Sequence, residues 1–309
     1  MSVSVHLWTW EDKVSDVNRF GLSAALATPF DSAMRIDTGK ALEHANFCLD
    51  NGCGSVTLFG TTGEGSSISN EERGLLLRAF IDGGIEPRQI VIGVMANSYV
   101  DAAEQTRQAL DAGCRSVLLA PPSYFKNLSD DGLFEWFSAV FTHVGTGCRD
   151  IILYNIPSVT AVEISVALVS RLREAFPAAV AGVKDSSGNW PYTETLLAAH
   201  RDIAILIGDE RSLSAGVRLG GQGAISGLAN IYPDRLLVMA TEGRDDQSVV
   251  DAVNEIVKFP VIPAVKALIA HQTGDDGWRR ARAPLQSIPV SDANRLRGIF
   301  DRLFRASAA

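Results

Sequence analysis

The stretch IILYNIPSVTAVEISVALVSRLREAFPAAVAGVKDS, residues 151–186, contains two apolar runs with an amphipathic segment between them. The runs at 151–157 and 180–186 are nearly continuous in small and aliphatic residues and do not alternate with polar ones. This pattern is typical of strands that are covered on both faces in a parallel sheet. Residues 162–176 repeat their apolar side chains at helical spacing, so the stretch predicts a strand, a helix and a second strand.

The same alternation extends along the chain in both directions. Several of the amphipathic segments begin after Ser, Asp or Asn and end just before Gly, as capped helices do. Eight strand-like runs alternating with helices predict an α/β fold of the (β/α)8 TIM barrel type, whereas a doubly wound sheet would fit fewer strands. The six further runs lie at 21–30, 55–60, 90–95, 116–122, 204–210 and 223–228.

Only helical patterns follow the eighth run. We expect residues 21–245 to form the catalytic barrel and residues 246–309 to form a C-terminal helical appendage, with residues 1–20 as an N-terminal extension. Pro260 and Pro263 should break or kink the long helical pattern in the appendage, because proline removes a backbone donor and crowds the preceding turn.

Composition argues against several classes of protein. The formal net charge of -8 disfavours binding to nucleic acid or to an anionic membrane, because both need a basic surface. The four cysteines form no CxxC pair and no histidines have HExxH spacing, so no metal site is predicted. The first 20 residues lack the apolar core of a signal peptide, and no run reaches the roughly 18 apolar residues of a membrane span. We therefore expect a soluble, cytoplasmic protein.

The ends of the predicted strands carry the polar groups. In a barrel of this type, the loops that follow the strands gather around one open mouth, where active sites lie. We therefore expect the following polar groups to share one rim: GTTGEG (60–65), YNIP (154–157), Lys184, GDE (208–210) and GAIS (223–226).

Lys184 is the lysine that lies within a strand-like run; the other five lie outside such runs. Burial disfavours a charged amine and makes the neutral nucleophile available. Such an amine can attack a ketone to give an iminium, which accepts electrons when a neighbouring carbon loses a proton or a carbon-carbon bond breaks. The structural alternative is an ion pair between Lys184 and Asp185 or another carboxylate of the rim.

Tyr154 and two threonines complete this group. The phenol of Tyr154 can relay protons, although a strand-end tyrosine whose hydroxyl meets water is also common. GTTGEG lacks the GxxxxGK[ST] spacing of a phosphate loop and has no basic side chain nearby. Thr61 and Thr62 instead offer two hydroxyls and backbone N–H groups beside glycines, which suits a carboxylate.

GTTGEG, YNIP and GVKDSSGN, followed by LGGQGAISGLANIYP, resemble the motifs of the dihydrodipicolinate synthase and N-acetylneuraminate lyase superfamily of class I aldolases. The resemblance covers residues 21–245 and, more loosely, the helical tail. It implies that Lys184 is the Schiff-base lysine and that Tyr154 is the proton-relay tyrosine.

The resemblance also implies how a pyruvate unit binds. Thr61 and Thr62 would supply a hydroxyl partner and a cup for the carboxylate, and Gly60 would leave room for the pyruvate unit. The backbone carbonyl of Ile225 would face the keto acid. No metal or organic cofactor is implied, because the covalent iminium with Lys184 supplies the electron sink.

Two positions depart from the synthase branch of this superfamily. Where that branch has an arginine that holds the carboxylate of the aldehyde substrate, this chain has Val159, which cannot form such a pair. A charge-assisted contact of this kind contributes about 1.5 to 3 kcal/mol. The loop that crosses between subunits usually has paired tyrosines, and here the pair is Tyr124 and Phe125. A one-residue insertion would put Tyr124 in the relay position, and without it Phe125 sits there. The resemblance implies a homo-oligomer, a dimer or a tetramer.

Both departures resemble the branch that acts on 2-keto-3-deoxy sugar acids, whose second product is an uncharged hydroxyaldehyde. Ser186 is then a candidate partner for a substrate hydroxyl, although a serine that caps the turn after a strand fits equally well. We therefore expect reversible aldol cleavage of a 2-keto-3-deoxy acid to pyruvate and an aldehyde.

Other functions remain open at the level of the sequence. Within the same chemistry, these are 4-hydroxy-tetrahydrodipicolinate synthase activity, an N-acetylneuraminate-type lyase, and a keto-acid dehydratase or deaminase. From other classes, a non-catalytic keto-acid sensor or a phosphosugar enzyme could use the same barrel. A phosphosugar enzyme would need a basic side chain near the last two strands, where Arg211 and Arg218 are available.

Overall fold

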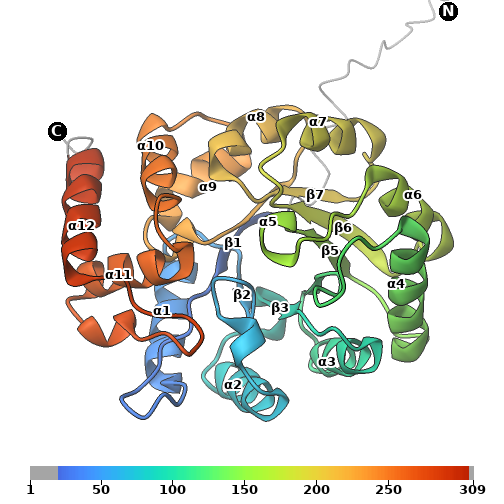
Figure 1. The fold of residues 1–309 in the computed structure, drawn as a ribbon, viewed down its shortest axis with the longest axis horizontal. Coiled ribbons are helices and arrows are strands. Elements are labelled where there is room, and N and C mark those ends of the chain that lie inside the picture. Colours follow the sequence, from blue (N-terminus) through green and yellow to red (C-terminus); the bar gives the residue numbers. More distant parts are fainter. Residues whose placement is uncertain (1–19, 306–309) are drawn as a thin grey trace, which may run out of the picture.

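The computed structural model describes residues 20–305, which form a closed barrel of parallel strands surrounded by helices (Figure 1). Strands adjacent in sequence pair with each other, and β1 pairs with β8 to close the barrel. The predicted (β/α)8 fold is confirmed: each strand begins at the first residue of its predicted run. The strands are β1 (Gly21–Ala25), β2 (Ser55–Leu58), β3 (Ile90–Val94), β4 (Ser116–Leu119), β5 (Ile151–Asn155), β6 (Val180–Asp185), β7 (Ala204–Ile207) and β8 (Gly223–Ser226).

Helices cover the outside of the barrel. Those within the β/α alternation are α1 (Thr38–Asp50), α2 (Asn70–Asp82), α3 (Tyr99–Asp111), α4 (Asp130–Val144), α5 (Pro157–Thr160), α6 (Val166–Ala175), α7 (Trp190–Ala199), α8 (Leu213–Arg218) and α9 (Pro233–Glu242). Short 3-10 helices are η2 (Gly65–Ser67), η3 (Pro87–Gln89), η4 (Glu210–Ser212), η5 (Leu228–Asn230) and η6 (Asp276–Arg279). Serine side chains accept the N-terminal hydrogen bonds of four helices, as the sequence indicates: Ser69 for α2, Ser98 for α3, Ser129 for α4 and Ser165 for α6.

Three more helices follow the barrel: α10 (Gln247–Ile256), α11 (Val261–Thr273) and α12 (Val290–Arg305). Pro260 separates α10 from α11, which confirms the predicted break, and Pro263 lies in the first turn of α11. Figure 1 shows these helices together on one side of the barrel, near α1 and α9. In residues 20–305, no helix combines the length and the apolar character needed to cross a membrane.

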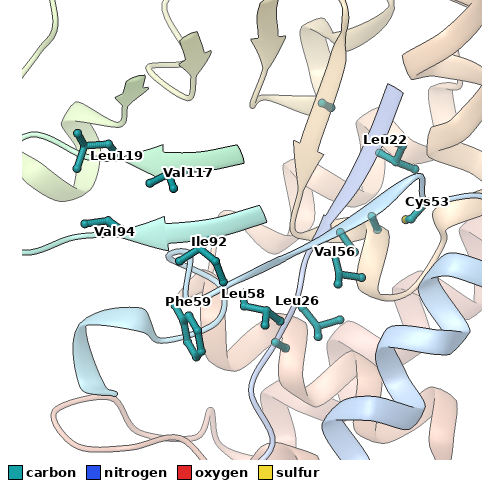
Figure 2. Close-up of a cluster of buried hydrophobic side chains, with 14 of the residues drawn as sticks. Leu22, Leu26, Cys53, Val56, Leu58, Phe59, Ile92, Val94, Val117 and Leu119 are labelled. Atoms are coloured by element: carbon teal, nitrogen blue, oxygen red, sulfur yellow. The ribbon is translucent and has the colours of Figure 1, made fainter. Parts of the chain in front are cut away.

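Successive strand residues point alternately to the helices and to the barrel interior. The outward side chains, among them Val56, Ile92 and Val117, pack beneath the helices in the large core that Figure 2 shows. The inward side chains, among them Tyr154 and Leu206, form a second cluster inside the barrel. Lys184 pairs in register with both of these inward residues. Its side chain therefore belongs to the interior.

A second buried lysine, Lys266, joins α11 to the GTTGEG loop. Lys266 and Glu64 are both fully buried, and the Nζ atom of Lys266 donates to Glu64 Oε1 at 2.5 Å and to Thr28 O at 2.9 Å. Burial lowers the pKa of Lys266, and the Glu64 carboxylate opposes that shift. The other carboxylate oxygen of Glu64 accepts from the backbone N–H of Arg282 at 2.9 Å. The C-terminal helices are thus bonded to the loop that carries the two threonines.

We predict that Lys266→Met destabilises the protein by about 3–5 kcal/mol, because it leaves the Glu64 carboxylate buried without its cation. The double variant Lys266→Met/Glu64→Gln should recover part of this loss, because no buried charge is then left over. Urea unfolding measures both. Lys258→Met, which removes the solvent-exposed pair with Glu255, serves as the control and should cost less than about 1 kcal/mol. A double variant no more stable than Lys266→Met would contradict the assignment.

Candidate active site

A cavity of about 400 Å³ opens at the carboxyl ends of the strands. It is the mouth at which the sequence places the polar strand ends. Seven of the predicted site residues line it: Thr61, Thr62, Tyr154, Val159, Lys184, Ser186 and Ile225.

Three of these side chains form a hydrogen-bonded chain. Lys184 is only 5% exposed, and its Nζ atom donates to the Tyr154 hydroxyl at 3.2 Å and lies 4.4 Å from the centroid of that ring. The Tyr154 hydroxyl is in turn 3.2 Å from Thr61 Oγ1. This chain gives a proton a route between the amine and the threonine.

Asp185 does not pair with Lys184. Because neighbouring residues of a strand face opposite sides, Asp185 points outward where Lys184 points inward. Within residues 20–305, no carboxylate lies at ion-pair distance from Lys184 Nζ, so the structural alternative from the sequence is not formed. The Asp185 carboxylate instead accepts three hydrogen bonds: from Asn155 Nδ2 at 3.0 Å, Ser187 N at 3.0 Å and Thr193 Oγ1 at 2.6 Å.

Two glycines allow the GTTGEG loop to turn tightly at the end of β2. A Cβ atom at Gly65 would lie 1.9 Å from the carbonyl oxygen of Phe59, and one at Gly63 would lie 2.7 Å from that of Leu26. Any side chain at either position would push the loop away from the barrel. The two threonines between β2 and this turn therefore depend on these glycines for their place in the cavity.

Gly60, which is predicted to leave room for the keto acid, does not line the cavity. It is buried. A Cβ atom there would meet Thr57 Cγ2 at 3.7 Å, which is an ordinary contact. Gly63 and Gly65, in contrast, are positions of this motif at which a Cβ atom would clash with backbone. The sequence shows all of these glycines but not which one meets another backbone segment.

Glu210 is a cavity residue to which the sequence gives no separate role. It belongs to the GDE motif that is predicted to lie at the rim. Glu210 is buried, and its Oε1 atom accepts a hydrogen bond from Ser226 Oγ at 2.5 Å. Burial raises the pKa of Glu210, while the bond from Ser226 and the charge of Lys184 act in the opposite direction. The neutral form of the carboxyl is therefore favoured relative to an exposed glutamate.

The two arginines considered for a phosphate site are already engaged. Within the described residues, Arg211 is the only arginine that lines the cavity. Its Nε atom lies 2.9 Å from Asp209 Oδ1 and its Nη2 atom 2.7 Å from Oδ2, a bidentate pair. Arg218 lies in α8, bonds to Gly243 O at 2.5 Å and does not line the cavity. Neither arginine is therefore free to hold a phosphate.

Tyr124 and Phe125 do not reach the cavity of their own chain. Tyr124 is 76% exposed, and its ring meets that of Phe125 edge-on with centroids 5.3 Å apart. The backbone N–H of Tyr124 donates to Asn97 Oδ1 at 2.9 Å, which fixes the start of the loop. That one of these rings serves a neighbouring subunit stays a prediction.

The C-terminal helices also contribute to the cavity, which the sequence does not indicate. Aliphatic side chains of α10 and α11, and of the segment between them, line it beyond the strand ends. Their positions lie outside the strand-like runs, so the pattern of strand ends does not indicate them. They are Val253, Ile256, Val257, Val261, Ile262 and Val265.

Comparison with known proteins identifies relatives of this chain. The model of the dihydrodipicolinate synthetase family matches residues 18–295. A crystal structure of dihydrodipicolinate synthase from Agrobacterium tumefaciens str. C58 is 58% identical, with a TM-score of 0.92, and the match covers 93% of this chain and 100% of that one.

Two other similar proteins have lower identity. The 4-hydroxy-tetrahydrodipicolinate synthase of Coxiella burnetii is 32% identical over 213 residues, 69% of this chain and 71% of that protein. The chloride-inhibited dihydrodipicolinate synthase of Acinetobacter baumannii, solved in complex with pyruvate, is 27% identical with a TM-score of 0.82. That match covers 92% of this chain and 98% of that one.

We predict that Tyr154→Phe slows iminium formation with pyruvate about 10²- to 10⁴-fold, because the ring stays beside Lys184 but the proton route to Thr61 is lost. Borohydride quenching at timed intervals, followed by intact-mass analysis, measures the rate. Tyr192→Phe is a matched control: its hydroxyl bonds to Ile164 O at 2.5 Å outside the cavity, so labelling should keep its rate. Labelling of Tyr154→Phe at the wild-type rate would show that the proton takes another path.

Proposed function

Because the chain belongs to the dihydrodipicolinate synthetase family, whose members are class I Schiff-base lyases, we propose that it catalyses reversible aldol cleavage of a 2-keto-3-deoxy acid to pyruvate and an aldehyde. The observation that carries this proposal is the geometry of Lys184. Its amine lies in a cavity, bonded to the Tyr154 hydroxyl and, within the described residues, without a carboxylate partner.

The proposed reaction begins when the neutral Lys184 amine attacks the keto carbon. Tyr154 passes the protons that convert the carbinolamine to an iminium with loss of water. When the bond between carbons 3 and 4 breaks, its electron pair enters the iminium to give an enamine, and the proton of the 4-hydroxyl leaves to a base. The aldehyde departs, the enamine is protonated at carbon 3, and hydrolysis releases pyruvate and free Lys184.

The remaining predicted site residues have roles in this proposal. Thr61 and Thr62 bind the keto-acid carboxylate, and the backbone carbonyl of Ile225 faces the bound keto acid. Ser186 donates to or accepts from a substrate hydroxyl. The support for these roles is that all four residues line the cavity in front of Lys184. The A. baumannii relative binds pyruvate, which supports pyruvate as the keto acid here.

The apolar side chain at position 159 favours an uncharged aldehyde. Val159 lines the cavity, and Arg211 already holds both oxygens of Asp209, so no free guanidinium of the described residues faces a second carboxylate. The second candidate is 4-hydroxy-tetrahydrodipicolinate synthesis. It is favoured by the names of the relatives from A. tumefaciens and C. burnetii, and it would require a carboxylate partner other than residue 159.

We also propose a homo-oligomer, a dimer or a tetramer. The exposed ring pair of Tyr124 and Phe125 supports this proposal, because such aromatic side chains are commonly covered at interfaces. The cytoplasmic location stays a prediction of the sequence.

The proposed function predicts one pyruvyl adduct on the peptide that contains Lys184 after borohydride reduction with pyruvate alone. Lys184→Ala should lose both the adduct and turnover, because no other described amine lines the cavity. Lys258→Ala, which removes an exposed lysine of the C-terminal helices, should keep both. Peptide mass analysis locates the adduct. The same adduct in Lys184→Ala would mean that another lysine forms the Schiff base.

Val159→Arg should change the choice of aldehyde. In the synthesis direction we expect the wild type to consume pyruvate with glyceraldehyde in preference to aspartate semialdehyde. The arginine should raise the use of aspartate semialdehyde relative to glyceraldehyde roughly 10- to 100-fold. This ratio corresponds to the free energy that a charge-assisted hydrogen bond contributes. Val100→Arg, at an exposed valine of α3, is the control for the added charge. An unchanged ratio in Val159→Arg would count against the role of this position.

A further inference from the structure

The cavity in front of Lys184 has an apolar rim. Three exposed valines belong to its lining: Val159 in α5 is 60% exposed, Val257 at the end of α10 is 49% exposed, and Val261 at the start of α11 is 45% exposed. A single exposed aliphatic side chain is ordinary on a protein surface. Three around one cavity are typical of a groove that binds a ligand.

The apolar surface continues inward from this rim. Val253, Ile256 and Val265 are buried and line the same cavity. The helix α10 stands over the end of β7, because Arg211 in η4 bonds to Asn254 of α10, with Nη1 and Oδ1 3.4 Å apart. The aliphatic side chains of the C-terminal helices therefore cover the outer part of the space that begins at Lys184.

Polar residues of the lining stand at the strand ends, as Lys184 does. Ser186 follows Lys184 by two residues, and its hydroxyl fills the space beside Gly208, where a Cβ atom would be 2.0 Å from Ser186 Oγ. Asp209 and Glu210 follow directly at the end of β7. Because these polar residues follow β6 and β7, whereas the aliphatic ones belong to the C-terminal helices, we expect a chain bonded to Lys184 to meet hydrogen-bonding groups first and aliphatic groups beyond them.

The following inference rests on the proposed function. We propose that the aldehyde released by this enzyme ends in an apolar group. The substrate is then a 2-keto-3-deoxy acid that keeps hydroxyls at carbons 4 and 5, beside the strand ends, and carries alkyl carbons beyond them. The bonds that form and break are those of the aldol cleavage described above. The rim valines act on the choice of aldehyde and take no part in the chemistry at Lys184.

The test uses the full-length protein in the synthesis direction, with pyruvate saturating and a series of 2-hydroxyaldehydes. Glyceraldehyde and lactaldehyde differ only in the terminal hydroxyl, and 2-hydroxybutanal and 2-hydroxypentanal extend the alkyl end. We expect kcat/KM for lactaldehyde to exceed that for glyceraldehyde roughly 10- to 100-fold. For the longer aldehydes, each added methylene that the rim covers should raise kcat/KM a further fourfold or so.

Variants at the rim identify the surface responsible. Val257→Ser and Val261→Ser replace half-exposed side chains, so the fold should persist, which urea unfolding checks. Both should flatten the dependence of kcat/KM on alkyl length. Val290→Ser, at an exposed valine of α12 outside the cavity lining, should keep the wild-type dependence.

The outcomes separate this inference from the proposed function. If pyruvate alone gives no adduct on Lys184, the proposed function fails and the inference fails with it. If the adduct forms but glyceraldehyde is preferred to lactaldehyde, or kcat/KM does not rise with alkyl length, only the inference is overturned. If Val257→Ser and Val261→Ser change the sedimentation coefficient and leave the series unchanged, a second copy of the chain covers the rim and the inference is likewise overturned.

Discussion

The side-chain alternation of β6 determines which of its polar groups faces the barrel interior, and the candidate site depends on it. Lys184 faces the interior because Val183 and Asp185 on either side of it face the helices, and its register with Tyr154 on β5 brings amine and phenol to 3.2 Å. A shift of the strand by one residue would place the aspartate inside and the lysine among the helices. The outward network of Asp185 with Asn155 and Thr193 opposes such a shift, since it satisfies that carboxylate only on the outer face.

The C-terminal helices complete the site in two ways. Through Lys266, α11 holds the carboxylate of Glu64 and so fixes the loop that carries Thr61. Through their valines and isoleucines, α10 and α11 cover the outer part of the cavity. The segment that the sequence presents as an appendage therefore contributes both to the support of the GTTGEG loop and to the lining of the cavity. Folding of this segment and formation of the site are coupled by these contacts.

Local features of the sequence were sufficient to predict much of this structure. The start of every strand, the serine caps and the break at Pro260 follow from hydrophobic pattern, capping chemistry and proline geometry. Lys184 and Tyr154 could be identified because barrel topology brings strand ends together. The pairing of Glu64 with Lys266 could not, because it joins positions 202 residues apart and leaves no periodic signal. The need for glycine at 65, and not at 60, depends on an approach to Phe59 O that exists only in the folded chain.

The distance along the chain between Glu64 and Lys266 also has a consequence for biosynthesis. The ribosome produces the GTTGEG loop first, and the lysine that bonds to it follows 202 residues later. Until then the Glu64 side chain can stay hydrated only if the loop remains open to water. A nascent polypeptide that has completed all eight strands but not α11 would therefore still lack the lysine that holds the loop of Thr61 and Thr62 against the C-terminal helices.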